Sequence, residues 1–156
     1  MKYRCLSDEE LEHLAEYLKH FLIVNGIHAD EWEHMNKVKP TKAIELVELF
    51  SDTVLEKVYS NIAYLEHRTV DTCLVFHFTE SKIELISIQG KKDAMIDLST
   101  PENIHAALVN KGEKLSFFQT EKSYSKPRNE EIHQMIEQGC FVSSREFWNA
   151  LLIAIT

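Results

Sequence analysis

The sequence predicts an α+β fold in a single domain over residues 1–156, with about four mainly antiparallel strands and about six helices. Apolar residues recur at helical spacing over most of the first 60 residues. Between residues 64 and 89 they give way to short stretches rich in β-branched and aromatic residues. The predicted order is ααα-βββ-α-β-αα. Consecutive strands with short polar breaks favour an antiparallel sheet covered by helices on one or both faces.

Three helices are predicted in the first 60 residues. Ser7 and Glu10 have the spacing of a capping box, which begins a helix over 8–25. A short second helix follows from Asp30, and Pro40 separates it from a third that runs to about residue 60. The apolar stripe of the third helix consists of Ala43, Val47, Phe50, Val54, Val58 and Ile62.

Four strands are predicted, at Tyr64–Thr69, Cys73–Thr79, Lys82–Gln89 and Leu115–Thr120, the last with a possible continuation to Tyr124. The second strand is largely apolar on both faces, which is typical of a central strand covered on both sides. The third changes its apolar face midway, which a bulge or burial on both faces would explain.

Three more helices are predicted around the fourth strand. They begin at the Thr100-Pro101 start signal, at Asn129 and at the Ser143 cap. The last helix is apolar on almost every side, and such a helix should be covered all round. We therefore expect Leu151 and Leu152 in the core, with Phe147 or Trp148 closing the core or forming a dimer contact. The residues that make this helix apolar are Phe147, Trp148, Ala150, Leu151, Leu152, Ile153, Ala154 and Ile155.

The charge of the chain is negative and uneven. The formal net charge is −8, and the acids are concentrated toward the front of the chain. This balance disfavours nucleic-acid binding, which needs clustered Lys and Arg. No apolar run approaches the roughly 20 residues of a membrane span, and the N-terminus has no signal-peptide pattern. We therefore expect a cytoplasmic protein that does not enter a membrane.

The three cysteines, Cys5, Cys73 and Cys140, are odd in number and widely spaced. That pattern fits neither a disulfide framework nor a zinc site built from C-x-x-C pairs. We interpret them as reduced core thiols. Cys140, shortly before the Ser143 cap, is the alternative candidate for a reactive thiol.

Four of the eight histidines follow a glutamate by three residues, a spacing that places both side chains on one helix face. Each pair could offer an oxygen and a nitrogen ligand to a transition metal, as in carboxylate-bridged bundles. Glutamate is also favoured in the first turn of a helix, so a solvated face explains the same pattern. The pairs are Glu10/His13, Glu31/His34, Glu102/His105 and Glu130/His133. Glu31, His34, Glu130 and His133 are the candidate metal ligands.

Two further groups could carry chemistry. Glu66 and His67 lie on a strand next to that of His77, so the histidines could be cross-strand neighbours, and Cys73 could join them as a nucleophile. A hydrogen-bonded core histidine is the ordinary alternative. A basic stretch with interleaved aromatics could bind a phosphate or single-stranded nucleic acid, or could be a strand with its lysines in water. It contains Lys111, Lys114, Phe117, Phe118, Lys122, Tyr124, Lys126 and Arg128.

Short motifs resemble a small family of uncharacterised proteins from Bacteroidetes bacteria. They are Met1-Lys2-Tyr3-Arg4 before a capped helix, Ala29-Asp30-Glu31-Trp32, Phe50-Ser51-Asp52 and Tyr64-Leu65-Glu66-His67. The resemblance implies a bacterial cytoplasmic protein and transfers no catalytic residue.

The sequence does not assign a biochemical activity. It has no P-loop, dinucleotide fingerprint, nucleophile elbow or H-E-x-x-H motif, so no standard enzyme class is favoured. The acidic front half favours a non-enzymatic interaction or accessory protein that binds a protein partner or forms a homodimer. The alternative is a metal-binding domain or metal-dependent enzyme that uses the Glu-x-x-His pairs.

Overall fold

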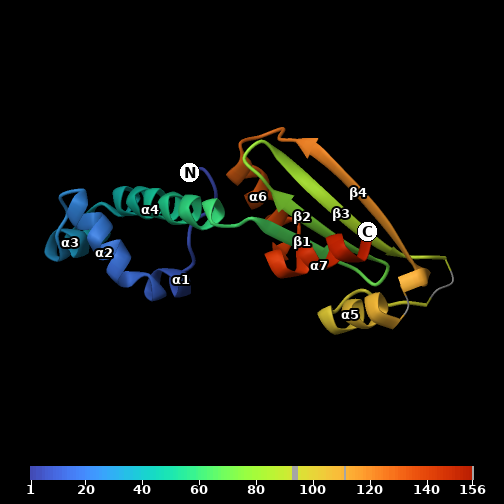
Figure 1. The fold of residues 1–156 in the computed structure, drawn as a ribbon. Coiled ribbons are helices and arrows are strands. Elements are labelled where there is room, and N and C mark those ends of the chain that lie inside the picture. The colour runs from blue at the N-terminus through green and yellow to red at the C-terminus, as the bar shows by residue number, and fades with distance from the viewer. Residues whose placement is uncertain (93–94, 111, 156) are drawn as a thin grey trace. The chain divides into compact units, whose positions relative to one another are not determined.

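The structure is a computed structural model that describes residues 1–92, 95–110 and 112–155. The chain forms two compact units, residues 1–58 and 59–156 (Figure 1). The first is helical, and the second contains the sheet with its helices. The α+β class and the antiparallel sheet are confirmed. The single domain over 1–156 stays a prediction.

Four helices make up most of the N-terminal unit. They are α1 (Asp8–His13), α2 (Ala15–Val24), α3 (Ala29–Val38) and α4 (Pro40–Ser60), the last of which extends just beyond the unit. The predicted capping box is present at the start of α1, where Ser7 and Glu10 satisfy each other's backbone N–H groups. The predicted helix over 8–25 is divided at Leu14, whose ψ of 17° separates α1 from α2.

The segment before α1 is bound along α4 by polar contacts. The carboxylate of Asp52 accepts hydrogen bonds from the backbone N–H groups of Lys2 and Tyr3, at 2.6 and 2.9 Å. The hydroxyl of Ser51 accepts one from the backbone of Leu6 at 3.0 Å. Because the first residues have no strand or helix partner for these donors, side chains of α4 hold the segment in place. The buried apolar residues of this unit are Tyr3, Leu6, Leu22, Ala43, Phe50 and Leu55.

The C-terminal unit is built on a five-stranded antiparallel sheet in the order β4-β3-β2-β1-β5. The strands are β1 (Tyr64–Arg68), β2 (Thr72–Phe78), β3 (Lys82–Gly90), β4 (Leu115–Ser123) and β5 (Phe141–Val142). The four predicted strands are present. The edge strand β5 was not predicted, because two residues are too few to show a period.

Helices cover both faces of the sheet. They are α5 (Pro101–Asn110), α6 (Arg128–Glu137) and α7 (Arg145–Ile155), with a short 3-10 helix at Gly112–Lys114. One face, with Val75 of β2 opposite Ile86 of β3, packs with buried residues of α5 and α7. Figure 1 shows α6 on the other side of the sheet from α7. The face of β2 and β3 that carries Val75 and Ile86 is largely buried, whereas Leu74, Phe76 and Leu85 on the other face are half-buried. The β2–β3 pairing is continuous, so β3 contains no bulge.

The last helix is covered on one side only, which corrects the expectation that it is enclosed all round. Trp148 and Leu151 are buried against the sheet core, as expected for a core helix. Leu152 and Phe147 are half-buried at its border. Ile153 is 76% exposed. The apolar composition overstated the burial because a helix eleven residues long presents its outer face to water wherever nothing packs on it.

No helix among the described residues combines the length and the apolar character needed to cross a bilayer.

Replacing Leu151 by Ala should lower the free energy of unfolding by about 2–5 kcal/mol, because the side chain is fully buried and leaves a cavity. Ile153→Ala, two residues further along α7, is the control and should change it by less than about 0.5 kcal/mol. Urea unfolding followed by circular dichroism measures both. Equal transition midpoints for the two variants would show that α7 is not part of the core.

The pKa of Glu10 should respond to Arg4. Hydrogen bonds from the Arg4 guanidinium and the Ser7 backbone lower the pKa of Glu10 from 4.5 to about 2. The lowered pKa means that this carboxylate stabilises the folded state above about pH 4.5 and ceases to do so as the pH falls toward 2. Arg4→Gln should raise the pKa of Glu10 toward its ordinary value, as measured by carboxyl carbon NMR shifts. Lys37→Gln is the control, and an unchanged Glu10 titration in Arg4→Gln would contradict the assignment.

Candidate functional site

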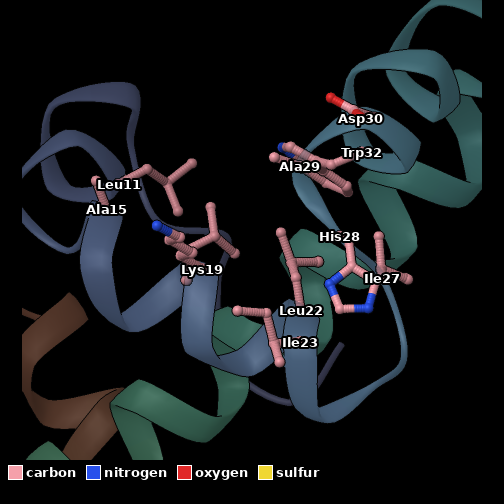
Figure 2. A pocket seen from close by; sticks show the side chains of 11 residues that line it. Leu11, Ala15, Lys19, Leu22, Ile23, Ile27, His28, Ala29, Asp30 and Trp32 are labelled. Atoms are coloured by element: carbon pink, nitrogen blue, oxygen red, sulfur yellow. The ribbon is translucent and has the colours of Figure 1, made fainter.

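An apolar groove lies among α1, α2 and α3 of the N-terminal unit (Figure 2). Its volume is about 490 Å³. Eight of the eleven residues that line it are apolar. The lining consists of Leu11, Ala15, Leu18, Lys19, Leu22, Ile23, Ile27, His28, Ala29, Asp30 and Trp32. A hollow of this size and composition is typical of a binding site.

One wall of the groove follows from the spacing of apolar residues along α1 and α2. Leu11, Ala15, Leu18 and Leu22 are separated by four, three and four residues, which places them along one side of the helical path. Leu14 is shared by the two helices: its N–H donates to the carbonyl of Glu10 at 3.1 Å at the end of α1, and its carbonyl accepts from the N–H of Leu18 at 2.9 Å at the start of α2.

The opposite wall depends on a tight turn between α2 and α3. Gly26 has a φ of +78°, a conformation that residues with a Cβ rarely adopt. The N–H of Ile27 then donates to the carbonyl of Leu22 at 2.8 Å, which closes the end of α2. The chain reverses, and α3 brings Trp32 to the side of the groove facing Leu11 (Figure 2).

The groove has a buried floor and an accessible rim. Leu22 is buried, Trp32 and Leu18 are half-buried, and Ile23 is 43% exposed. Large apolar side chains at this concave site remain partly in water. A partner that covers them removes apolar surface from water, which lowers the free energy of the complex. This arrangement is suited to binding an apolar surface.

The polar side chains in the groove lie at its rim. Lys19, His28 and Asp30 are all exposed. Helical spacing adds an acid on each side, because Glu16 lies one turn before Lys19 on α2 and Glu33 one turn after Asp30 on α3. The lining itself therefore holds one cation, Lys19, and one anion, Asp30, and the two neighbouring glutamates add negative charge along the same helices.

The candidate metal ligands fall in different units. Glu31 and His34 lie in α3, where both line a shallow hollow that also contains Lys39. Glu130 and His133 lie in α6 of the C-terminal unit, where the Nδ1 atom of His133 is 2.8 Å from the Tyr59 hydroxyl. In residues 1–92, 95–110 and 112–155, no three His, Cys, Asp or Glu side chains are grouped so that they could hold a metal ion.

The proposed pairing of His67 with His77 is wrong. In the β1–β2 register, Tyr64 is opposite His77, and His67 is opposite Leu74. Opposed residues share a face and neighbours in a strand alternate, so the two histidines point to opposite faces. Nothing in the composition of these strands fixes their register, and a shift of one residue changes every face.

His77 instead belongs to an aromatic cluster. Its ring is stacked on Tyr64 with 4.6 Å between the ring centroids, and Trp148 of α7 lies at 5.4 Å. Its Nδ1 atom is 2.9 Å from a carboxylate oxygen of Glu84 on β3. The histidine joins the sheet to α7, which is the role of a hydrogen-bonded core residue.

Glu66 is buried and paired within its own strand. Its carboxylate accepts hydrogen bonds from the Arg68 guanidinium at 2.7 and 2.8 Å. The guanidinium also lies 4.8 Å from the ring of Phe141 on β5. A buried carboxylate requires such a partner, because an unpaired charge in the interior is costly. Glu66 and Arg68 therefore support the β1–β5 edge of the sheet.

Comparison with known proteins identifies the family. The model of a family described as "Family of unknown function (DUF6495)" matches residues 1–156. The chain belongs to this family. The match covers the groove as well as the sheet, so both features lie within the region that defines DUF6495. No curated protein and no solved structure matches the chain significantly.

In this DUF6495 chain, burial makes Cys73 unsuited to act as a nucleophile. The thiol is fully buried, and desolvation raises its pKa from 9 to about 12. Burial also raises the pKa of Cys140. Because the thiolate is the reactive form, neither site favours nucleophilic chemistry.

Two residues of the basic stretch, Arg128 and Tyr124, make structural contacts. The guanidinium of Arg128 donates to the backbone carbonyls of Tyr59, at 3.1 Å, and Ile62, near the end of α4. Tyr124 donates its hydroxyl hydrogen to the carbonyl of Thr79. These contacts join the start of α6 and the residue after β4 to neighbouring turns. Lys114, Lys122 and Lys126 are exposed, as the structural interpretation predicted, although Phe118 is also 62% exposed. Lys111 lies outside the described residues.

The groove was not identified from the sequence, although its signals are present. The stripe from Leu11 to Leu22 was recognised as a helix face, but such a face is ordinarily covered by the rest of the fold. Trp32 in a short, strongly charged helix was the remaining signal. What could not be predicted is that α3 turns back beside α2 and leaves the stripe partly open.

Thiol reactivity should separate the cysteines. Cys5 is exposed and should react first with Ellman's reagent at pH 8, whereas Cys73 should react only on unfolding. Cys5→Ser should remove the fast phase of the reaction and leave its slower phases unchanged. Cys73→Ser is the matched control and should keep the fast phase. A fast phase that survives in Cys5→Ser and disappears in Cys73→Ser would show that Cys73 is accessible and reactive.

Proposed function

We propose that this chain is a non-enzymatic interaction protein that binds a protein partner through the groove of its N-terminal unit. The observation that carries the proposal is the concave apolar lining of the groove, with a partly exposed Ile23 and Trp32 at its sides. Partly exposed aromatic and aliphatic side chains in a concave site are the usual anchors of protein interfaces.

The charge of the same unit supports this proposal. Residues 1–58 contain twelve Asp or Glu residues and seven Lys or Arg residues. Exposed charge of one sign attracts a partner of the opposite sign and speeds the encounter, while apolar contacts supply most of the affinity. The acidic front half predicted from the sequence thus coincides with the unit that contains the groove.

The chemistry of the other side chains fits a binding protein better than an enzyme. The thiols of Cys73 and Cys140 are held in their neutral forms, and His77 and Glu66 are occupied by neighbours in the sheet. The three cysteines, all free, fit a reducing compartment, and we propose a cytoplasmic setting.

Affinity capture with matched variants tests the proposal. Ile23→Asn removes an apolar side chain from the groove, whereas Val24→Asn makes the same kind of change at an adjacent position outside the groove, where the side chain is 85% exposed. The wild-type chain and Val24→Asn should recover the same protein from a native lysate of the organism of origin, and Ile23→Asn should recover much less. Recovery of the chain only as a free monomer, at both low and moderate salt, would contradict the proposal.

A further inference from the structure

The shape of the groove matches the side of an α-helix. Its long wall consists of Ala15, Leu18 and Leu22 on α2, about two turns or roughly 10 Å of helix, with Leu11 of α1 before them. The facing wall is provided by α3. Helices associate by packing the ridges of side chains on one helix into the grooves on the surface of another, and the open sides of α2 and α3 offer such surfaces. An amphipathic helix with apolar residues one turn apart would fill this groove.

The exposure of the lining favours a helix over a small molecule. Six of the eleven lining residues, Ala15, Lys19, Ile23, His28, Ala29 and Asp30, are exposed. Small-molecule sites typically bury about 70–90% of the ligand surface, which this open rim would not achieve. A helix needs only one face covered, so its other side can stay in water.

The charges around the groove select a basic helix. Asp30 and Lys19 line the groove, Glu16 and Glu33 lie one turn from them along α2 and α3, and the N-terminal unit contains twelve Asp or Glu residues against seven Lys or Arg residues. Lys or Arg side chains that flank the apolar face of an incoming helix would lie near these carboxylates. The side chain of Trp32 adds an aromatic face on which such a cation can stack.

The same charges argue against a second copy of this chain as the occupant. Among the described residues, none of the seven helices contains more Lys and Arg than Asp and Glu. Each would therefore bring neutral or negative charge to an acidic rim, and the net charge of −8 adds repulsion between copies.

We infer that the groove binds a basic amphipathic α-helix of a different protein, an inference that rests on the proposed function. The apolar face of that helix lies against Leu11 and the two turns of α2 from Ala15 to Leu22. Its flanking Lys or Arg side chains face Glu16, Asp30 and Glu33. The contact therefore depends both on apolar spacing and on positive charge.

Three synthetic peptides of about 18 residues, long enough to form a helix on binding, test both requirements against the full-length chain. The first has Leu at helical spacing with Lys elsewhere. The second has the same composition with Leu and Lys in alternation, which suits a strand, and the third replaces every Lys of the first by Glu. Isothermal titration calorimetry should show saturable 1:1 binding for the first peptide and binding at least about tenfold weaker for the others.

The matched variants separate groove binding from general attraction to an acidic protein. Ile23→Asn should lower the affinity of the chain for the first, Leu–Lys helical peptide about tenfold or more, whereas Val24→Asn should leave that affinity unchanged. Asp30→Asn should weaken binding at low salt and lose that effect at high salt. Equal affinities for the helical and alternating peptides, or equal effects of Ile23→Asn and Val24→Asn, would overturn the inference.

These experiments distinguish a failure of the helix inference from a failure of the proposed protein-binding function. If the Leu–Lys helix does not bind but capture from lysate still depends on Ile23, the groove binds a protein and the assigned occupant is wrong. If a second copy occupied the groove, sedimentation would show a dimer that Ile23→Asn dissociates and Val24→Asn does not, which also overturns the inference. If neither peptide binding nor capture depends on Ile23, both proposals fail together.

Discussion

The need to cover apolar residues on both faces of β2 and β3 is the constraint on which the C-terminal unit depends. Strands that are apolar on both sides must be covered twice, so the chain has to supply helices for each face. The helices α5 and α7 bury one face, on which Val75 and Ile86 lie. The helix α6 lies on the other side, with Ile132 fully buried. Buried polar groups in this unit need partners as well. The carboxylate of Glu66 can remain inside only because the Arg68 guanidinium pairs with it.

The N-terminal unit satisfies its apolar surface less completely, because it has no sheet for its helices to cover. Its first residues are held along α4 by side-chain acceptors, chiefly Asp52 and Ser51, rather than by strand pairing. The turn at Gly26 then folds α3 back beside α2 without closing the space between them. The groove is a consequence of helix packing in a small unit, whose limited size leaves a larger share of its apolar surface in contact with water.

The sequence predicted features whose cause is local and missed those whose cause is tertiary. The capping box at Ser7 and the strands from Tyr64 to Gln89 follow from spacing within a few residues, and the structure contains them. The relation between His67 and His77 depends on register, which the composition of the strands does not fix. The exposure of Ile153 depends on what packs against the outer side of α7, and a helix's own sequence does not contain that information.

The candidate site also combines features that the sequence shows locally with one that only the tertiary structure shows. The acidic character of the front half was readable from composition, and the stripe from Leu11 to Leu22 from spacing. Neither indicates a site alone, because acidic residues usually solvate a surface and a stripe usually faces a core. In the structure they occur in one unit, where the stripe lines a partly open groove together with Asp30 and Trp32 of α3. An unfilled helix position and a surplus of negative charge are independent properties, and a basic amphipathic helix is the partner that satisfies both.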